Sequence, residues 1–162
     1  MTESVIIREV QDRDREAIVR IFNHYAVNGF AAYPEQQVTE RFFPFLRDGT
    51  LSFYVLETPE GVIGFGLTKP FLPFPAFSGT CMLTYFIAPG HLNRGFGSRL
   101  LDRLTRDARK MGLSMMVANM ASRNEASIRF HKKHGFEEAG RLHNVGVKFG
   151  EPFDVIWMQK TL

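Results

Sequence analysis

The sequence predicts one mixed α/β domain with a largely antiparallel sheet, spanning residues 1–162, and three observations support this fold class. A chain of 162 residues, 44% of them apolar, can build one hydrophobic core and is too apolar to be disordered. Short β-rich runs alternate with apolar patterns of helical period along the whole chain. No repeat, low-complexity tract or linker-like segment divides it.

The apolar residues of the first half follow strand and helix periods in turn. Asp12 can cap a helix whose apolar residues recur on one face, and Asn28-Gly29 would end it. The turn Pro59-Glu60-Gly61 between two β-rich runs predicts a hairpin. In order, the predicted elements are a strand over 5–10, the helix after Asp12, a short helix capped by Thr39, and strands over 51–57 and 62–68.

The second half carries longer apolar runs. Residues 80–88 (TCMLTYFIA) are almost continuously apolar, as expected of a central strand. A helix with apolar residues at helical spacing follows, and Gly112 would close it. Ser122 to Glu125 has the form of a capping box, which predicts another short helix. The remaining predicted strands cover residues 114–120, 136–148 and 153–160.

Composition and charge exclude several classes of protein. The net charge is +3, and the basic residues are scattered rather than clustered, so no nucleic-acid partner is expected. The chain has no apolar run of about 18 residues, and charges interrupt its start, so we expect neither a membrane span nor a signal peptide but a soluble cytoplasmic protein. Cys81 is the only cysteine and is expected to pack as a small apolar residue.

Two glycines, Gly95 and Gly97, lie between the predicted strand over 80–88 and the helix that follows it. The first turn of a helix has free N–H groups and partial positive charge, and glycine lets a phosphate approach the backbone. A dinucleotide fingerprint needs a third glycine where Leu100 stands, and a Walker A loop needs a lysine where Ser98 stands. The turn therefore predicts an anion site of another type, with a ligand-free tight turn as the alternative.

A second motif, NEASIRFHKKHGF, covers residues 124–136. Together with YFIAPGH, HLNRGFGSRLL and the tail VGVKFGEPFDVIWMQKTL, it resembles the GCN5-related N-acetyltransferase (GNAT) superfamily. The pattern is most similar to the phosphinothricin and methionine sulfoximine acetyltransferase group. The resemblance covers nearly the whole chain and implies the GNAT fold. In that fold a twisted mixed sheet splays at its centre between flanking helices, and acetyl-CoA, without a metal, lies in the cleft.

The resemblance implies which residues hold acetyl-CoA. The backbone of Tyr85, Phe86 and Ile87 would bind the pantetheine arm. Asn124 would hydrogen-bond the same arm, although it could also simply cap a helix. Leu92 stands where the family usually has Gln or Arg, so one side-chain contact is expected to be missing. The amides of the glycine turn would hold the pyrophosphate: Asn93, Arg94, Gly95, Phe96, Gly97 and Ser98.

The resemblance also implies catalytic residues. His131 stands where the phosphinothricin group has a histidine that would protonate the leaving thiolate. The glutamate that serves that group as general base corresponds to Met82, which cannot accept a proton. Glu35 is the first substitute, and a water chain without a dedicated base is left open. Three other groups are further substitutes: Glu57, Asp154 and His143.

The implied function is an N-acetyltransferase that moves the acetyl group of acetyl-CoA to the amine of a small molecule, an amino acid or an analogue. The loss of the base at Met82 leaves a non-catalytic acyl-CoA-binding or sensing module as the alternative. Paired chains are common in this group, so a homodimer is expected. Five aromatic residues are expected near the acceptor cleft, which would make the acceptor less polar than phosphinothricin: Phe30, Tyr33, Phe71, Phe74 and Phe77.

Overall fold

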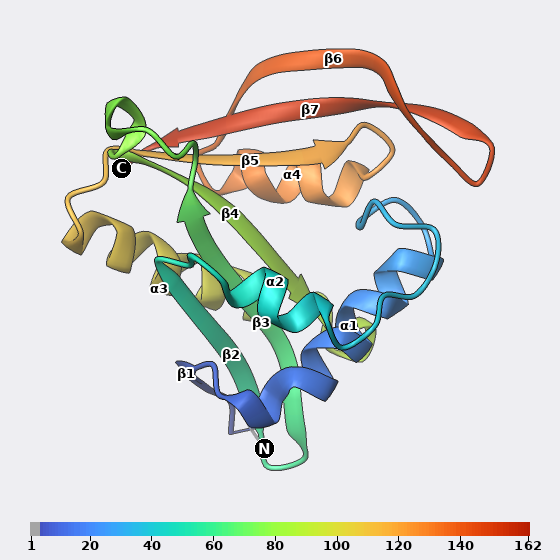
Figure 1. Ribbon diagram of the computed structural model, residues 1–162, viewed down its shortest axis with the longest axis vertical. Helices are drawn as coiled ribbons and strands as arrows, with labels where there is room; N and C mark the ends of the chain where they lie inside the picture. Colours follow the sequence, from blue (N-terminus) through green and yellow to red (C-terminus); the bar gives the residue numbers. More distant parts are fainter. Residues whose placement is uncertain (1–3) are drawn as a thin grey trace.

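The computed structural model describes residues 4–162 as a seven-stranded sheet flanked by four α-helices (Figure 1). This confirms the predicted mixed α/β class and the order of its elements. Three short 3-10 turns, Asp12–Asp14, Pro75–Phe77 and Pro89–His91, join some of them. The main elements are β1 (Ile6–Glu9), α1 (Arg15–Val27), α2 (Phe42–Arg47), β2 (Ser52–Thr58), β3 (Gly61–Pro70), β4 (Thr80–Ile87), α3 (Phe96–Lys110), β5 (Met115–Ala121), α4 (Glu125–Lys133), β6 (Glu137–Lys148) and β7 (Glu151–Thr161).

The sheet splits at its centre. Its strand order is β1-β2-β3-β4-β5-β7-β6, and every neighbouring pair is antiparallel except β4 and β5. The parallel pairing of β4 with β5 runs only from Thr80 opposite Met115 to Met82 opposite Val117. Beyond this point β4 stays with β3 and β5 stays with β7, so the two strands diverge (Figure 1). The splayed sheet is therefore confirmed, and Met82 lies at the fork.

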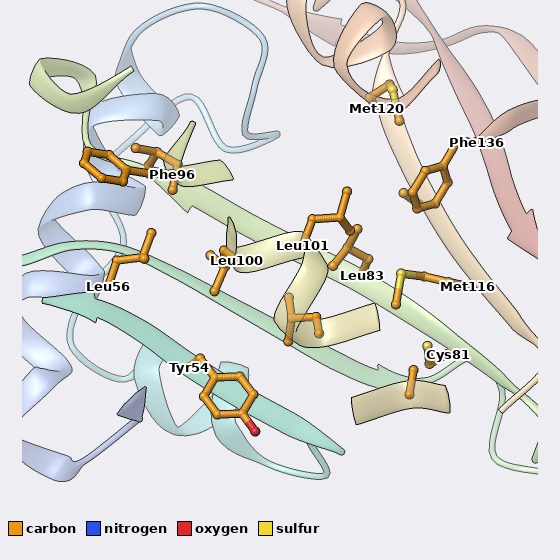
Figure 2. Packing of buried hydrophobic residues seen from close by; sticks show 14 of the residues in the cluster. Tyr54, Leu56, Cys81, Leu83, Phe96, Leu100, Leu101, Met116, Met120 and Phe136 are labelled. Carbon is orange, nitrogen blue, oxygen red and sulfur yellow. The ribbon is translucent and has the colours of Figure 1, made fainter. Parts of the chain in front are cut away.

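Strand β2 is buried on both faces, so the sheet separates two hydrophobic clusters. Phe53 and Val55 pack with apolar side chains of α1 and α2. Tyr54 and Leu56 alternate with them and point to the other face, where they pack with α3. Figure 2 shows this second cluster, with Leu100 of α3 lying among side chains of the central strands. The helices α1 and α2 thus cover one face, and α3 covers the opposite face.

Helix α3 packs closely against β3 at Gly66. A Cβ atom there would lie 2.9 Å from Cδ2 of Leu100 and 3.0 Å from Cδ1 of Leu104, and both leucines are fully buried. The absence of a side chain at Gly66 therefore sets the distance between α3 and the sheet. Because the glycine turn leads into α3, this contact also positions the turn beside β4.

Replacing Gly66 with valine is expected to lower the free energy of unfolding by about 1–3 kcal/mol, because the buried leucines must move to admit the side chain. Urea denaturation followed by circular dichroism measures the change. Gly140→Val is the matched control, since a Cβ at Gly140 meets nothing within 4 Å. Equal losses in the two variants would contradict the packing argument.

Two predicted helix caps are wrong, although the helices themselves are present. Asp12 lies in a 3-10 turn and pairs with Arg47, and Asp14 occupies the N-cap position of α1. Thr39 precedes α2 by three residues, and its carbonyl, rather than its side chain, accepts the amide of Phe42. In both places the chain makes an extra turn before the helix, and the acidic or hydroxyl side chain falls outside the capping position.

The predicted capping box at Ser122 is also wrong. The N-cap of α4 is Asn124, whose Oδ1 accepts the amide of Ser127 at 3.3 Å. Ser122 directly follows β5 and is still bonded to β7, because its amide donates to the carbonyl of Asp154 (2.8 Å) and its hydroxyl accepts the Asp154 amide (2.9 Å). Pairing with β7 therefore delays the start of the helix by two residues.

Three structural findings concern a membrane span, a metal site and the single cysteine. Within residues 4–162, no helix is long and apolar enough to cross a membrane. The same part of the chain contains no group of three or more His, Cys, Asp or Glu residues placed to hold a metal ion. Cys81 is fully buried, and burial raises the pKa of its thiol to about 11. Cys81 therefore packs as a small apolar residue, as predicted.

Candidate functional site

A cavity of about 810 Å³ opens where β4 and β5 part. On the face covered by α3 it is lined by the glycine turn and α4. On the opposite face lies a second group of lining residues, which we call the α1/α2 wall: Phe22, Tyr25, residues 31–34, Phe42 and Leu46. Met82 of β4 and Asn119 of β5 line the cavity from the parted strands. The cavity therefore connects the two faces of the sheet through the split.

The free edge of β4 supplies backbone groups to this cavity. Ala88, just after β4, donates its amide to β3 at 2.8 Å, and the antiparallel register runs unbroken back to Thr80. Peptide groups alternate in direction along a strand, so those of Phe86 point to β3, whereas those of Tyr85 and Ile87 point to the cavity. An extended chain that carries amides can pair with this edge as an added strand would.

The glycine turn brings backbone amides to the same cavity. Asn93 and Gly95 have φ angles of 60° and 80°, and these left-handed residues bend the chain sharply into α3, whose N-cap is Gly95. The unpaired amides of the first helical turn and the helix dipole favour an anion at this point. Arg94 is not among the residues that line the cavity. The lining residues of the turn are Asn93, Gly95, Phe96, Gly97 and Ser98.

Helix α4 is tied to the glycine turn through His134. Its Nδ1 donates to the carbonyl of Phe130 at 2.8 Å, so its Nε2 accepts the hydroxyl of Ser98 at 2.8 Å. Asn124, at the other end of α4, caps the helix and also lines the cavity. Both functions expected of Asn124 therefore remain compatible with its position.

His131 is 3% exposed, and its ring lies between α4 and β4. Nδ1 lies 2.7 Å from the carbonyl of Ser127, and a carbonyl only accepts, so Nδ1 carries the proton. Nε2 then accepts from the hydroxyl of Tyr85 at 3.3 Å. Burial lowers the pKa of His131 and the neighbouring His134 acts in the same direction, whereas the Ser127 bond opposes them. His131 is thus a neutral base at pH 7, with Nε2 at the cavity.

Glu35 is engaged by the turn between β6 and β7 and not by the cavity. Its carboxylate accepts the amide of Phe149, in the turn between β6 and β7, and Glu35 is not among the lining residues. The other substitutes predicted for the missing base are also paired elsewhere: Glu57 with Arg8, and Asp154 with Arg141 and His143. The described residues that line the cavity include no aspartate or glutamate.

Of the five aromatic residues expected near the acceptor cleft, only Tyr33 lines the cavity. Its ring stacks on Phe153 with 6.0 Å between centroids, and its hydroxyl donates to Oδ1 of Asn119 at 2.7 Å. Burial raises the pKa of Tyr33 to about 12, so the hydroxyl stays protonated. The others pack elsewhere: Phe30 against Phe149 and Phe153, Phe71 against Phe77 and Trp157, and Phe74 in solvent at 61% exposure.

Comparison with known proteins identifies the family. Residues 16–136 match the family model described as the acetyltransferase (GNAT) family. The chain belongs to the GNAT family. It is 33% identical to the L-methionine sulfoximine/L-methionine sulfone acetyltransferase of Salmonella typhimurium over 160 residues, which cover 96% of this chain and 94% of that protein.

Two solved structures show the same GNAT fold. A ribosomal-protein-alanine N-acetyltransferase from Brucella melitensis superposes with a TM-score of 0.88 at 33% identity, over 97% of this chain and 99% of that one. A GNAT phosphinothricin acetyltransferase from Sinorhizobium meliloti, in complex with AcCoA, superposes with a TM-score of 0.87 at 26% identity, over 98% and 88% of the two chains. The suspected resemblance to the phosphinothricin group is thereby confirmed.

In this GNAT chain, sequence reasoning missed the residues of α1 and α2 that reach the cavity. Phe22 and Tyr25 belong to the apolar face of the helix predicted after Asp12, and that pattern predicts burial in the core. Phe22 does pack in the core, and its ring centroid lies 4.2 Å from that of Phe42. Phe22 and Tyr25 nevertheless also line the cavity. The Tyr25 hydroxyl donates to the carbonyl of Ile87, at the free edge of β4. Their helical spacing was a signal for burial and could not show that the helix stops beside a cleft.

The sequence also gave no sign of Lys148, which is 1% exposed. Its Nζ donates to the carbonyls of Ala32 (2.6 Å) and Tyr25 (3.3 Å). Together with the bond between Glu35 and Phe149, it ties the loop after α1 to the β6–β7 hairpin. Residues 31–34 of this loop form part of the α1/α2 wall, so a lysine far along the GNAT chain positions one side of the cavity.

Proposed function

We propose that this GNAT enzyme transfers the acetyl group of acetyl-CoA to the amine of a small molecule. One observation carries the proposal: the free edge of β4 joins a glycine turn at the start of a helix to a cavity that holds a neutral histidine. The Salmonella relative is named for acetylating methionine sulfoximine and methionine sulfone, and the Sinorhizobium structure contains AcCoA. An amino acid or an analogue is therefore the first acceptor class to test.

The cavity fits acetyl-CoA by its donor groups. The pyrophosphate would accept the amides of residues 93–98, and the pantetheine arm would pair with the backbone of Tyr85 and Ile87 and with the side chain of Asn124. Phe86 would contribute its ring rather than its peptide groups. Bound in this way, acetyl-CoA supplies a thioester whose carbonyl carbon faces the acceptor.

His131 would carry the proton that the reaction moves. An amine that arrives as an ammonium must lose a proton before its nitrogen attacks the thioester carbonyl. Nε2 of neutral His131 accepts that proton, directly or through one water, after the Tyr85 hydroxyl has turned away from it. When the C–N bond has formed and the C–S bond breaks, the same nitrogen returns the proton to the thiolate. Between ammonium and amide the nitrogen loses two protons: one passes through His131 to the thiolate and the other passes to solvent water, so Met82 and Glu35 need not supply a base.

The test of this function is a released-thiol assay at saturating acetyl-CoA with a panel of amino acids, arylalkyl amines, polyamines and an alanine-terminated peptide. We expect turnover with at least one small amine. Calorimetry of acetyl-CoA binding is measured in parallel. Tight binding of acetyl-CoA without turnover on any acceptor would favour the non-catalytic acyl-CoA-binding module instead.

Gly97→Ala is expected to raise KM for acetyl-CoA by about tenfold, equivalent to about 1.4 kcal/mol, with little effect on folding. A Cβ at Gly97 would stand 3.5 Å from the ring of Phe130, an ordinary contact, and both residues line the cavity. Gly90→Ala is the matched control, because Gly90 meets nothing within 4 Å and does not line the cavity. An unchanged KM in Gly97→Ala would remove the turn from the cofactor site.

We also propose that the enzyme is a single GNAT domain over residues 1–162 that works as a cytoplasmic, metal-free homodimer without a nucleic-acid or membrane partner. The edge strand β6 supports the dimer, since edge strands with exposed apolar side chains are common pairing surfaces. Light scattering after size-exclusion chromatography measures the oligomeric state. The exposed apolar residues of β6 are Leu142, Val145 and Val147, which are 50–67% exposed.

A further inference from the structure

The histidine and lysine side chains that line the cavity all lie on one face of the sheet. They are His91, beside the glycine turn, and His131, Lys133 and His134 of α4. The α1/α2 wall contains no lysine, arginine, histidine, aspartate or glutamate. The lining lysine, Lys133, therefore lies on the side where the cofactor would bind, and the side left for the acceptor has no charged side chain.

We propose that the acceptor is an amine without a carboxylate, with an apolar or aromatic body, rather than an α-amino acid. This inference rests on the proposed function and names the substrate class of the same site. A carboxylate that enters a largely apolar cavity loses its hydration, and only a cation or several N–H donors can compensate for that loss. The α1/α2 wall provides no cationic side chain for this purpose.

Two lysines that contact α2 or the loop of this wall are engaged with backbone carbonyls. Lys69 pairs in register with Met82, but its Nζ donates to the carbonyl of Phe45 at 2.8 Å and lies 5.2 Å from the centre of the Phe45 ring. Lys148 is buried behind the loop and donates to the carbonyls of Ala32 and Tyr25. Neither lysine is among the residues that line the cavity.

The groups that are present suit an amine on an apolar body. The ring centroids of Phe22 and Tyr25 each lie 5.4 Å from that of Phe86, and all three residues line the cavity. This aromatic cluster can pack against an apolar group. Oδ1 of Asn119 accepts the hydroxyl of Tyr33 and has a second lone pair. This oxygen can accept an N–H of the acceptor at the strand fork, and it needs no counter-charge.

The test compares acceptors that differ only in the carboxylate: phenethylamine with phenylalanine, and 3-(methylthio)propylamine with methionine. At saturating acetyl-CoA, we expect kcat/KM for each amine to exceed that for its amino acid by about tenfold or more, because the amino acid must bury an unpaired charge. Equal or higher values for the amino acids would overturn the inference while leaving the acetyltransferase function intact.

Binding separates the inference from the function on which it rests. Calorimetry with the protein–CoA complex measures the affinity of the same four compounds without any chemical step. If nothing turns over but the amines bind more tightly than the amino acids, the proposed function fails and the inference on the site holds. Tighter binding of the amino acids, or no binding of either class, would overturn the inference.

Two variants test whether the preference for the amine arises from the absence of a cation at the cavity. Asn119→Lys places an ammonium group at the cavity and is expected to reduce the preference for the amine by about fivefold or more, as a new partner for the carboxylate. Lys69→Met is the matched control and is expected to leave the preference unchanged. If Lys69→Met selectively removed activity on the amino acids, Lys69 would be their carboxylate partner and the inference would be wrong.

Discussion

Replacing His131 with phenylalanine is expected to lower kcat by about 10²–10⁴-fold, the usual contribution of a positioned acid–base group. The ring of phenylalanine fills the same buried space between α4 and β4 but cannot accept a proton at the position of Nε2. KM for acetyl-CoA should change little, because the proposed contacts to the cofactor come from backbone groups and Asn124. Steady-state rates at varied acetyl-CoA and acceptor separate the two constants.

His131→Asn is the control for this experiment. The asparagine amide can still donate to the carbonyl of Ser127, as Nδ1 of His131 does, but it has no basic nitrogen. It should therefore lose as much activity as the phenylalanine variant while keeping the wild-type thermal unfolding profile. A rate in either variant equal to that of the wild type would remove His131 from the mechanism.

The lowered pKa of His131 also predicts a pH dependence. Burial holds the pKa below the ordinary value of 6.5, so the ring stays neutral in the folded enzyme at a pH where it is protonated in the unfolded chain. The unfolded state then binds more protons, so this group's contribution to stability is complete above pH 6.5 and falls as the pH drops from 6.5 toward the folded pKa. Urea denaturation between pH 5 and 8 gives the free energy of unfolding at each pH. A plot of this free energy against pH should be less steep for His131→Asn than for the wild type.

Lys148→Met is expected to lower the free energy of unfolding by about 1–3 kcal/mol, because the variant leaves the buried carbonyl of Ala32 without a donor. It should also raise KM for the acceptor without raising KM for acetyl-CoA, since residues 31–34 form part of the α1/α2 wall. Urea denaturation and steady-state kinetics measure the two effects.

Lys110→Met is the matched control for this variant, because Lys110 is exposed at the end of α3. It should leave both quantities unchanged. Wild-type stability and acceptor KM in Lys148→Met would show that the loop does not depend on the lysine. A rise in KM for acetyl-CoA alone would also contradict the assignment, because it would place the effect on the other face of the sheet.

Sequence reasoning succeeded where the signal was local. The strand over residues 80–88 and the helix after Gly95 were predicted from apolar periodicity and glycine punctuation, and both are present as β4 and α3. It failed where a distant strand intervened. The capping box at Ser122 has the right spacing, but hydrogen bonds to Asp154 hold Ser122 against β7, and the cap passes to Asn124.

The same distinction applies to the candidate site. The sequence by itself determined the side proposed for the cofactor, because a strand, a tight turn and a helix that follow one another along the chain bring their own backbone amides together. Only the tertiary structure decided the acceptor side. That side is formed by the loop at residues 31–34, by Met82 at the fork and by Asn119, and Lys148 holds the loop from behind. Its charge and its lack of a carboxylate therefore depend on contacts between distant segments. The carboxylate of Glu35 shows the reason: its bond to the Phe149 amide, across more than a hundred residues, holds it outside the cavity.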